Sequence, residues 1–323
     1  MFDYFPVSAK EFDGPVLVTG AGGCIGSWVL ALLERAGVQV HAFDLQIDKR
    51  RPGLLMDTDS LNRVVWHAGD IADTQAVKSV VARTGAKAII HLAALQVPFC
   101  RADPVAGALV NVVGTVNVFE AAKASGVKRL TYASSVAAYG ALDNGGAMST
   151  LYGAYKYCNE QTAKVYSEEN GIHSVGIRPG VVYGVGRDQG MTSKTTVAIL
   201  AAAASKPYTI PFSGDVSWLF AGEVASAFIR SVAQDRTGAP VFDLNGKLAS
   251  VQEGIDHIKA LVPGASIDCT GQPLAFPMDH SDDPLKACIG DYGQMPLKAG
   301  IEETLQKFQQ LLKDKKLDAS HLQ

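Results

Sequence analysis

The residues best suited to chemistry are Tyr152 and Lys156, which stand four positions apart in the run Tyr-Gly-Ala-Tyr-Lys. On a helix, this spacing places both side chains on one face. A nearby ammonium favours the phenolate and lowers the pKa of the phenol, so that the phenol can act as a general base. The pair therefore suits oxidation of a substrate hydroxyl. The same pattern also occurs as a solvated helix pair, so it needs a second motif.

That second motif is a glycine-rich segment that follows the apolar run Val16-Leu17-Val18. Its glycines are spaced G-x-x-G-x-x-G, which permits a tight turn and lets backbone N–H groups approach a pyrophosphate at a helix N-terminus. The segment predicts a dinucleotide site. The expected contacts are Gly20, Gly23, Cys24, Ile25 and Gly26.

Asp44 closes the second expected strand and predicts which dinucleotide binds. A carboxylate at this place accepts hydrogen bonds from the adenosine ribose hydroxyls and repels a 2′-phosphate. The next basic residues come at Lys49, Arg50 and Arg51. We therefore expect NAD rather than NADP.

The elements that must position these motifs alternate between short apolar runs and helix-length segments. Strands are expected at 15–19, 39–43, 63–67, 88–92, 130–133, 174–178 and 241–244, and helices at 25–36, 74–84, 104–125 and 151–170. The alternation predicts an α/β fold with a Rossmann-type, doubly wound parallel sheet. We expect an NAD-binding domain at 13–183 with a returning strand near 240–246, and a smaller discontinuous C-terminal substrate lobe at 184–235 and 262–323. The segments 1–12 and 316–323 are expected to be frayed.

Composition excludes several classes of function. The net charge of −3 shows no excess of basic residues, so no nucleic-acid partner is expected. The 5 cysteines and 7 histidines are scattered, which predicts no metal site and no disulfide framework. No apolar run is long enough to predict a membrane span, and the first residues lack the pattern of a signal peptide. We therefore expect a cytoplasmic protein.

Further segments, in the same order, make the chain resemble the extended short-chain dehydrogenase/reductases, the superfamily of the NAD-dependent epimerases and dehydratases. They are Gly69-Asp70-Ile71, His91-Leu92-Ala93-Ala94, Asn111-Val112-Val113-Gly114-Thr115, Ser134-Ser135-Val136-Ala137-Ala138-Tyr139-Gly140 and Arg178-Pro179-Gly180-Val181-Val182-Tyr183-Gly184. The resemblance implies a catalytic set of Ser135, Tyr152 and Lys156, with Lys156 also holding the nicotinamide ribose. It implies further cofactor contacts from Asp70, Ile71, Leu92, Ala93, Ala94, Asn111 and Pro179. A homodimer formed through 104–125 and 151–170 is also expected.

Three departures from the family pattern bear on the reaction. Val136-Ala137 stand where sugar dehydratases carry Asp-Glu, which disfavours dehydration. Asp215-Val216 replace the arginine that grips the diphosphate in nucleotide-sugar epimerases, and Gly180 replaces a common Asn. We therefore expect a small substrate, such as a free sugar, a sugar acid or a similar secondary alcohol, oxidised by an NAD-dependent oxidoreductase. An epimerase that retains its NAD, possibly acting on a nucleotide sugar, and a catalytically dead dinucleotide sensor remain as alternatives.

Candidate substrate contacts are polar side chains near the expected hydride-transfer site. They are Gln96, Ser135, Arg187, Thr192 and Lys194. Arg187 or Lys194 suits a substrate carboxylate, although both also suit a solvated loop. On the helix of Tyr152, we expect Tyr155, Cys158, Thr162 and Val165 to form the packing stripe.

Overall fold

A seven-stranded parallel sheet forms the centre of the computed structural model, which describes residues 1–141, 149–275, 280–320 and 322. The strand order is β10-β6-β5-β4-β1-β2-β3, and every neighbouring pair is parallel. The strands are β1 (Val16–Thr19), β2 (Val40–Asp44), β3 (Val65–Ala68), β4 (Ala88–His91), β5 (Arg129–Ala133), β6 (Val175–Pro179) and β10 (Val241–Leu244). This arrangement confirms the predicted Rossmann-type fold.

Burial explains why these apolar runs form central strands. Every residue of β1 and of β4 is buried, as expected for parallel strands that are covered on both faces. The edge strand β3 has no buried residue. The glycine segment directly follows β1, and Asp44 is the last residue of the neighbouring strand β2, so they meet at one edge of the sheet.

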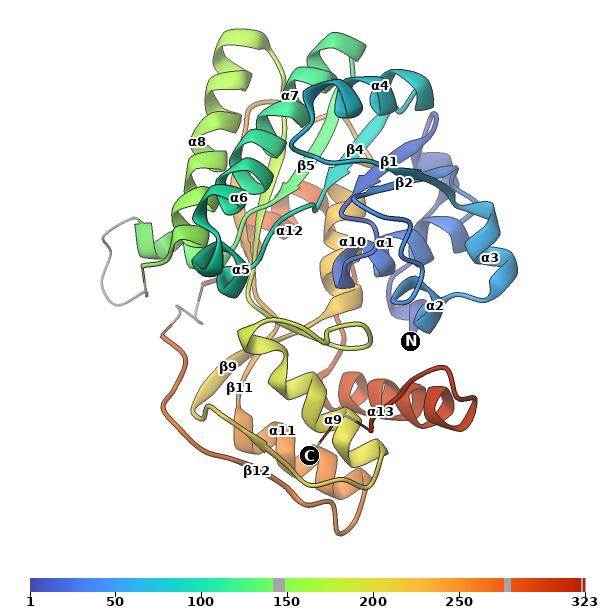
Figure 1. Cartoon of the computed structure of the whole chain (residues 1–323), viewed down its shortest axis with the longest axis vertical. Coiled ribbons are helices and arrows are strands. Elements are labelled where there is room, and N and C mark those ends of the chain that lie inside the picture. The colour runs from blue at the N-terminus through green and yellow to red at the C-terminus, as the bar shows by residue number, and fades with distance from the viewer. Residues whose placement is uncertain (142–148, 276–279, 321, 323) are drawn as a thin grey trace.

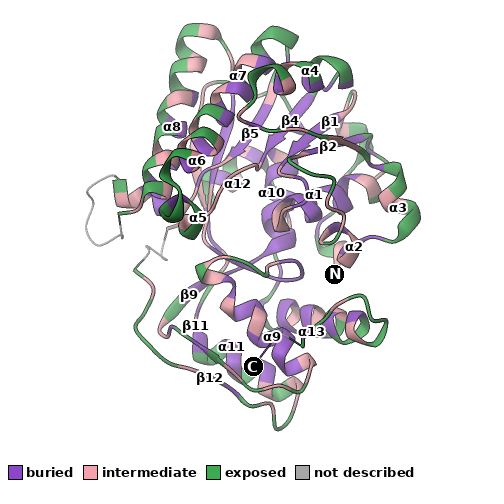
Figure 2. Ribbon diagram, in the orientation of Figure 1, coloured by how far each residue is buried: buried purple, intermediate pink, exposed green. Residues whose placement is uncertain are grey.

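Helices cover both faces of the sheet (Figure 1). One face is covered by α4 (Thr74–Thr84), α7 (Gly114–Ser125) and α8 (Leu151–Asn170), and the other by α1 (Cys24–Arg35), α10 (Ala221–Ser231) and α12 (Asp283–Ile289). The outward surfaces of α4 and α8 are largely exposed, whereas the strands between the layers are buried (Figure 2). The sheet is therefore the rigid support on which the site is built.

The predicted helix at 104–125 is present but irregular. It consists of α6 (Pro104–Ala108), a π-helical turn at Leu109–Val113 and then α7. By length and composition alone, Pro104–Ser125 is long and apolar enough to cross a membrane, with a mean hydropathy of 1.5. Half of that stretch is buried inside the protein, and α7 packs against α4 and α8. The packing accounts for its apolar composition.

A smaller group of elements lies beyond the carboxyl ends of the sheet strands (Figure 1). It contains β7 (Val181–Tyr183), β8 (Tyr208–Ile210), β9 (Asp215–Phe220), β11 (Lys247–Ser250), β12 (Ile267–Cys269), α9 (Lys194–Ala203), α11 (Val251–Leu261) and α13 (Leu297–Lys313). The helix α10 falls within the predicted lobe but packs against α1 and β5, whereas α11 falls outside it and packs against α9 and α13. The predicted domain ranges themselves stay a prediction. Short helices complete the chain at α2 (Pro52–Leu55), α3 (Thr58–Arg63), α5 (Val97–Ala102), Val136–Ala141 and Met191–Ser193.

The prediction that both ends of the chain are frayed is wrong for specific residues. Phe5 is buried and stacks on Phe220 with ring centroids 5.9 Å apart. Near the other end, Leu322 is buried, and its carbonyl accepts a hydrogen bond from Lys206 at 2.7 Å. Both ends are held because their apolar side chains complete the core.

Candidate active site

A cavity of about 590 Å³ opens at the carboxyl ends of the sheet strands, where α/β sheets bind ligands. It brings together nearly all the residues that the sequence singled out. The predicted residues that line it are Gly20, Gly23, Cys24, Ile25, Gly26, Asp44, Asp70, Ile71, Leu92, Ala93, Ala94, Gln96, Ser135, Tyr152, Lys156, Pro179, Arg187 and Thr192. Asn111 and Lys194 are not among its lining residues, and the contacts predicted for them stay predictions.

The glycine segment forms a cradle in which the glycine positions carry no side chain. Gly20 has a φ of +67°, the left-handed region that favours glycine. A Cβ on Gly26 would collide with the carbonyl of Gly20, so a larger residue cannot stand there. Cys24 begins α1, and burial raises the pKa of its thiol to about 11, so no negative charge opposes a phosphate at this helix N-terminus. The segment fits a dinucleotide pyrophosphate.

Asp44 is oriented by the backbone around it. Its Oδ2 accepts a hydrogen bond from the Gly22 N–H at 2.8 Å, and its Oδ1 accepts one from the Leu45 N–H at 2.8 Å. Each carboxylate oxygen still has a free lone pair, because an ionised carboxylate accepts about four hydrogen bonds. Asp70 is held in a similar way by the Ala72 N–H. The predicted ribose and adenine contacts therefore have suitable acceptors at the cavity wall.

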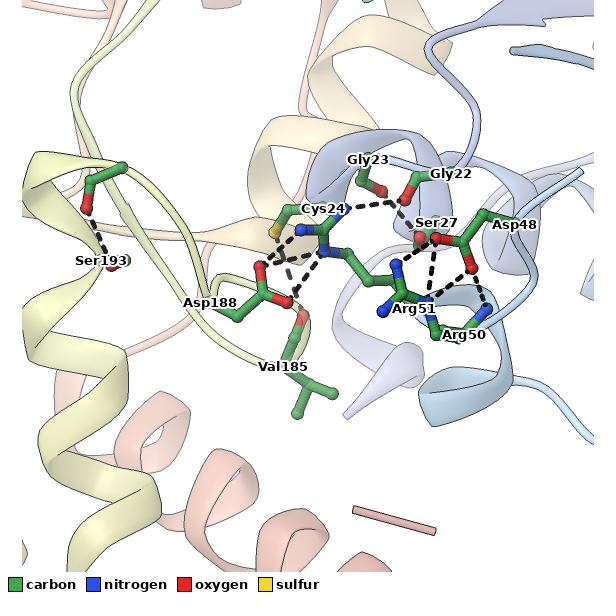
Figure 3. Close-up of polar contacts among 11 residues, drawn as sticks. Gly22, Gly23, Cys24, Ser27, Asp48, Arg50, Arg51, Val185, Asp188 and Ser193 are labelled. Carbon is green, nitrogen blue, oxygen red and sulfur yellow. Dashed lines mark hydrogen bonds and ion pairs between the residues drawn. The ribbon is translucent and has the colours of Figure 1, made fainter. Parts of the chain in front are cut away.

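An ion pair joins the two loops that flank this part of the cavity. Arg51, at the start of α2, donates to both carboxylate oxygens of Asp188 over distances of 2.8 to 3.1 Å. Its Nη1 also donates to the Gly22 carbonyl at 3.3 Å. Figure 3 shows Arg51 and Asp188 pointing toward one another, beside Cys24 and the glycine segment. We call this pair the clasp.

Tyr152 and Lys156 lie in the first turns of α8, as predicted from their spacing. Thr150 caps this helix by accepting a hydrogen bond from the Gly153 N–H, and Gly153 packs too closely on the Ala137 carbonyl to allow a larger residue. Lys156 is 3% exposed and donates to the Ala133 carbonyl at 2.6 Å. Its Nζ lies 5.6 Å from the centroid of the Tyr152 ring. The phenol and the ammonium therefore face the same cavity.

The electrostatics of this pair differ from the simplest expectation. Burial raises the pKa of Tyr152, and this outweighs the Ser135 hydrogen bond and the positive charge of Arg187, which both lower it. Burial also lowers the pKa of Lys156 to about 8. The groups that lower the pKa of the phenol here are Ser135 and Arg187. The lowering predicted from Lys156 stays a prediction.

Buried polar groups hold the cavity wall from behind. Asn111 accepts a hydrogen bond from the Leu95 N–H at 2.9 Å and donates to the Leu95 carbonyl at 3.0 Å. The π-helical turn frees the Asn111 carbonyl, which then accepts hydrogen bonds from Thr115 and Asn159. Through these bonds, Asn111 fixes the chain just before Gln96.

His91 acts in a similar way at the end of β4. Its two ring nitrogens pair with the hydroxyls of Thr19 and Thr115 at 2.7 and 3.1 Å. Burial lowers its pKa to about 3, so the ring is neutral. His91 therefore ties the glycine segment to α7 and adds no charge to the site.

The candidate substrate contacts meet at the Gly190 turn. Gly190 has a φ of +92°, and a Cβ there would collide with Oε1 of Gln96 and lie 3.3 Å from Nη2 of Arg187. The same Nη2 donates to Thr192 Oγ1 at 3.1 Å. Lys194 begins α9. Gln96, Arg187 and Thr192 thus converge on one place.

Sequence reasoning missed both members of the clasp as site residues. Arg51 was visible as the last residue of the basic run Lys49-Arg50-Arg51, but nothing in that run indicates which guanidinium turns toward the glycine segment. Asp188 stands beside Arg187 in a loop that the sequence placed in the substrate lobe. Trp218 and Phe220 belong to the core, with exposures of 2% and 0%.

Comparisons with known proteins agree with this geometry. Residues 16–245 match the NAD dependent epimerase/dehydratase family. A UDP-glucose 4-epimerase of Mycolicibacterium smegmatis is 30% identical over 90% of this chain and 97% of its own. The match to the UDP-glucose 4-epimerase of Rhizobium meliloti, at 32% identity, covers 50% of each chain, so this chain spans about half the length of that relative.

Solved structures share the fold at lower identity. The UDP-glucose 4-epimerase of Thermus thermophilus, in complex with NAD, is 22% identical and superposes with a TM-score of 0.75 over 91% of this chain and 98% of its own. The L-threonine dehydrogenase of Clostridium difficile is 20% identical, with a TM-score of 0.80 over 94% and 99%. One fold therefore serves both an epimerase and a dehydrogenase among these proteins.

Proposed function

Because the chain belongs to the NAD-dependent epimerase/dehydratase family, we propose that it is an NAD-dependent oxidoreductase acting on a small hydroxylated substrate. The substrate class is a free sugar, a sugar acid or a similar secondary alcohol. The observation that carries the proposal is the shared cavity of Tyr152, Lys156 and Ser135 with the glycine cradle. A general base and a dinucleotide site side by side are what oxidation of a hydroxyl requires.

The step follows from the positions of the side chains. As the phenolate, Tyr152 takes the proton from the substrate hydroxyl, the carbon–hydrogen electron pair leaves as hydride, and a carbonyl forms; the positive nicotinamide ring of bound NAD would add to Ser135 and Arg187 in favouring the phenolate. Ser135, whose hydroxyl lowers the pKa of Tyr152, orients the reacting oxygen. Lys156 supplies positive charge beside the phenol from a fixed position under the Ala133 carbonyl. When bound, NAD supplies the hydride acceptor.

The shape of the wall supports a small substrate over a nucleotide sugar. A Cβ on Gly180 would come within 2.5 Å of Ser217 Oγ and 3.0 Å of Asn245 Oδ1, so the asparagine of many epimerases has no room at this place. Asp215 is exposed at the start of β9, and Val216 beside it is buried. Neither residue can replace a cationic clamp for a diphosphate.

An epimerase that returns the hydride to the other face of its substrate is the second candidate. The Mycolicibacterium relative, a UDP-glucose 4-epimerase that matches over 90% of this chain, favours it. Both candidates share the first proton and hydride transfer. They differ in whether the product and the reduced cofactor leave.

Absorbance at the NADH maximum separates them. The protein is incubated with excess NAD and a panel of sugars, sugar acids, polyols and hydroxy acids, and with UDP-glucose in parallel. We expect NADH to accumulate in many-fold excess over protein with a small alcohol. A changed sugar configuration in UDP-glucose with no net NADH would contradict the dehydrogenase and support the epimerase.

We also propose a homodimer. Val105, Leu109 and Val113 recur every four residues along one helical face and are 69%, 46% and 38% exposed. Leu151 on the neighbouring α8 is 45% exposed. Large apolar side chains gathered in this way favour association with a second copy. Light scattering should give twice the 34.1 kDa mass of one chain, and a mass of 34.1 kDa would contradict the proposal.

A further inference from the structure

Two neighbouring residues of opposite charge, Arg187 and Asp188, are directed to different partners. Asp188 pairs with Arg51 in the clasp. Arg187 has no ion pair among the residues that the structure describes, and its Nε is buried without a hydrogen-bond partner there. The clasp therefore engages the carboxylate that is adjacent to Arg187 in the sequence, and the positive charge of Arg187 is left free for a ligand.

The position of Arg187 indicates that its ligand is the substrate. Arg187 lines the cavity together with Tyr152, and its charge lowers the pKa of that phenol. Its Nη2 is held by Thr192, and the Gly190 turn brings it close to the Gln96 amide. The cation thus stands beside the reacting centre, between groups that donate or accept hydrogen bonds.

A half-buried guanidinium without a counter-charge is costly, and an anion with two oxygens removes that cost. Carboxylates and phosphates match the planar fork of arginine through two parallel hydrogen bonds. We propose that Arg187 is the anion-recognition residue of the substrate pocket, and that the substrate carries a carboxylate or a phosphate near the hydroxyl that is oxidised. This inference rests on the proposed function and narrows its substrate class.

Anion binding to the enzyme loaded with NADH tests the inference without turnover. Malonate and inorganic phosphate are titrated separately by calorimetry into the wild type, R187Q, R187K and the control K128Q, which removes an exposed cation of the loop that follows α7. We expect one of the two anions to bind the wild type and K128Q alike. R187Q should bind that anion about 10- to 100-fold more weakly, with R187K in between. The anion that binds identifies a carboxylate or a phosphate.

Three outcomes would overturn the inference. They are no binding of either anion to the wild type, equal binding to R187Q, and a loss of NADH affinity in R187Q as large as the loss of anion affinity. The last would assign Arg187 to the cofactor pyrophosphate.

Matched substrates separate this inference from the proposed function. D-Galacturonate is compared with D-galactose, and D-glucose 6-phosphate with D-glucose, by NADH formation. R187Q should raise KM for the charged member of the active pair about 10- to 100-fold more than for the neutral member, because any effect of Arg187 on the Tyr152 pKa is common to both members. Equal losses for both members would overturn the role of Arg187 while NADH formation by the wild type still supports the oxidoreductase. Anion binding with no NADH from any alcohol would instead overturn the proposed function alone.

Discussion

At the cofactor end of the cavity a partly exposed ion pair joins two loops, whereas at the substrate end the cations Lys156 and Arg187 have no ion-pair partner among the described residues. Arg51 and Asp188 are 20% and 58% exposed and bind each other. Lys156 is 3% exposed and binds a backbone carbonyl, and Arg187 binds a hydroxyl. A weak, solvated pair suits a ligand that must enter and leave. Buried charges suit proton transfer, because electrostatic interactions are stronger away from water.

The largest expected effect lies at the substrate end. Replacing Tyr152 by Phe removes the general base and keeps the ring that packs near Lys156. We expect kcat to fall about 10²- to 10⁴-fold, while the Kd for NADH stays within about two-fold of the wild type. Stopped-flow hydride transfer and NADH fluorescence measure the two quantities.

Unchanged turnover in this variant would contradict a catalytic role and return the chain to a dinucleotide sensor. A parallel loss of NADH affinity would break the division between the two ends, because Tyr152 would then contribute to both.

The cofactor end and the substrate end of the cavity also differ in how well the sequence predicts their residues. The cofactor end is encoded locally: the glycine segment follows β1 and Asp44 ends the adjacent strand β2, so their meeting follows from the sheet alone. The residues of the substrate end come from several loops, and their contacts depend on tertiary packing. Nothing in the local sequence brings Gln96 to the Gly190 turn, since the bonds of Asn111 place it there.

The predicted packing stripe of α8 shows the same limit. Cys158 and Val165 are exposed, and the buried residues of this helix are Gly153, Lys156, Asn159, Glu160 and Ala163. Helical periodicity favours apolar residues for the interior. Here the interior side is polar because Glu160 forms a buried ion pair with Arg178 at 2.6 Å and accepts a hydrogen bond from Ser134. Polar partners on distant strands are not visible in the helix sequence.

The buried charge of Lys156 has a consequence for stability. Its pKa of about 8 in the folded protein lies below the ordinary lysine value of about 10.4, so the unfolded chain holds more protons between these two pH values. The Lys156 contribution to the free energy of unfolding of the NAD-free protein should therefore rise with pH across this window, by at most about 3 kcal/mol, and it is measured as the difference between the wild type and K156M. K156M should lack this contribution, so that it is more stable than the wild type near pH 7 and loses that advantage by pH 10.

Urea unfolding at several pH values gives the slope of the free energy of unfolding against pH for the wild type and for K156M. R51Q is the matched control from the cofactor end, because an arginine stays charged throughout this range and its removal leaves the slope unchanged. Equal slopes for the wild type and K156M would show that burial does not disfavour the charged form of Lys156. The difference in electrostatics between the two ends of the cavity would then rest on Arg187 alone.

The smallest expected effect lies in the clasp. R51Q and D188N should each raise the dissociation rate of NADH about 2- to 5-fold, as expected for a partly exposed ion pair, and the double variant should match the singles. Raising the salt concentration should speed dissociation from the wild type and leave the double variant nearly unaffected.

If R51Q speeds dissociation and D188N does not, the bond from Arg51 to the Gly22 carbonyl is responsible rather than the ion pair. D188N has one further use: if it lowers anion affinity while R51Q does not, then Asp188 supports the Arg187 site directly, and the two ends of the cavity are coupled through adjacent residues of one loop.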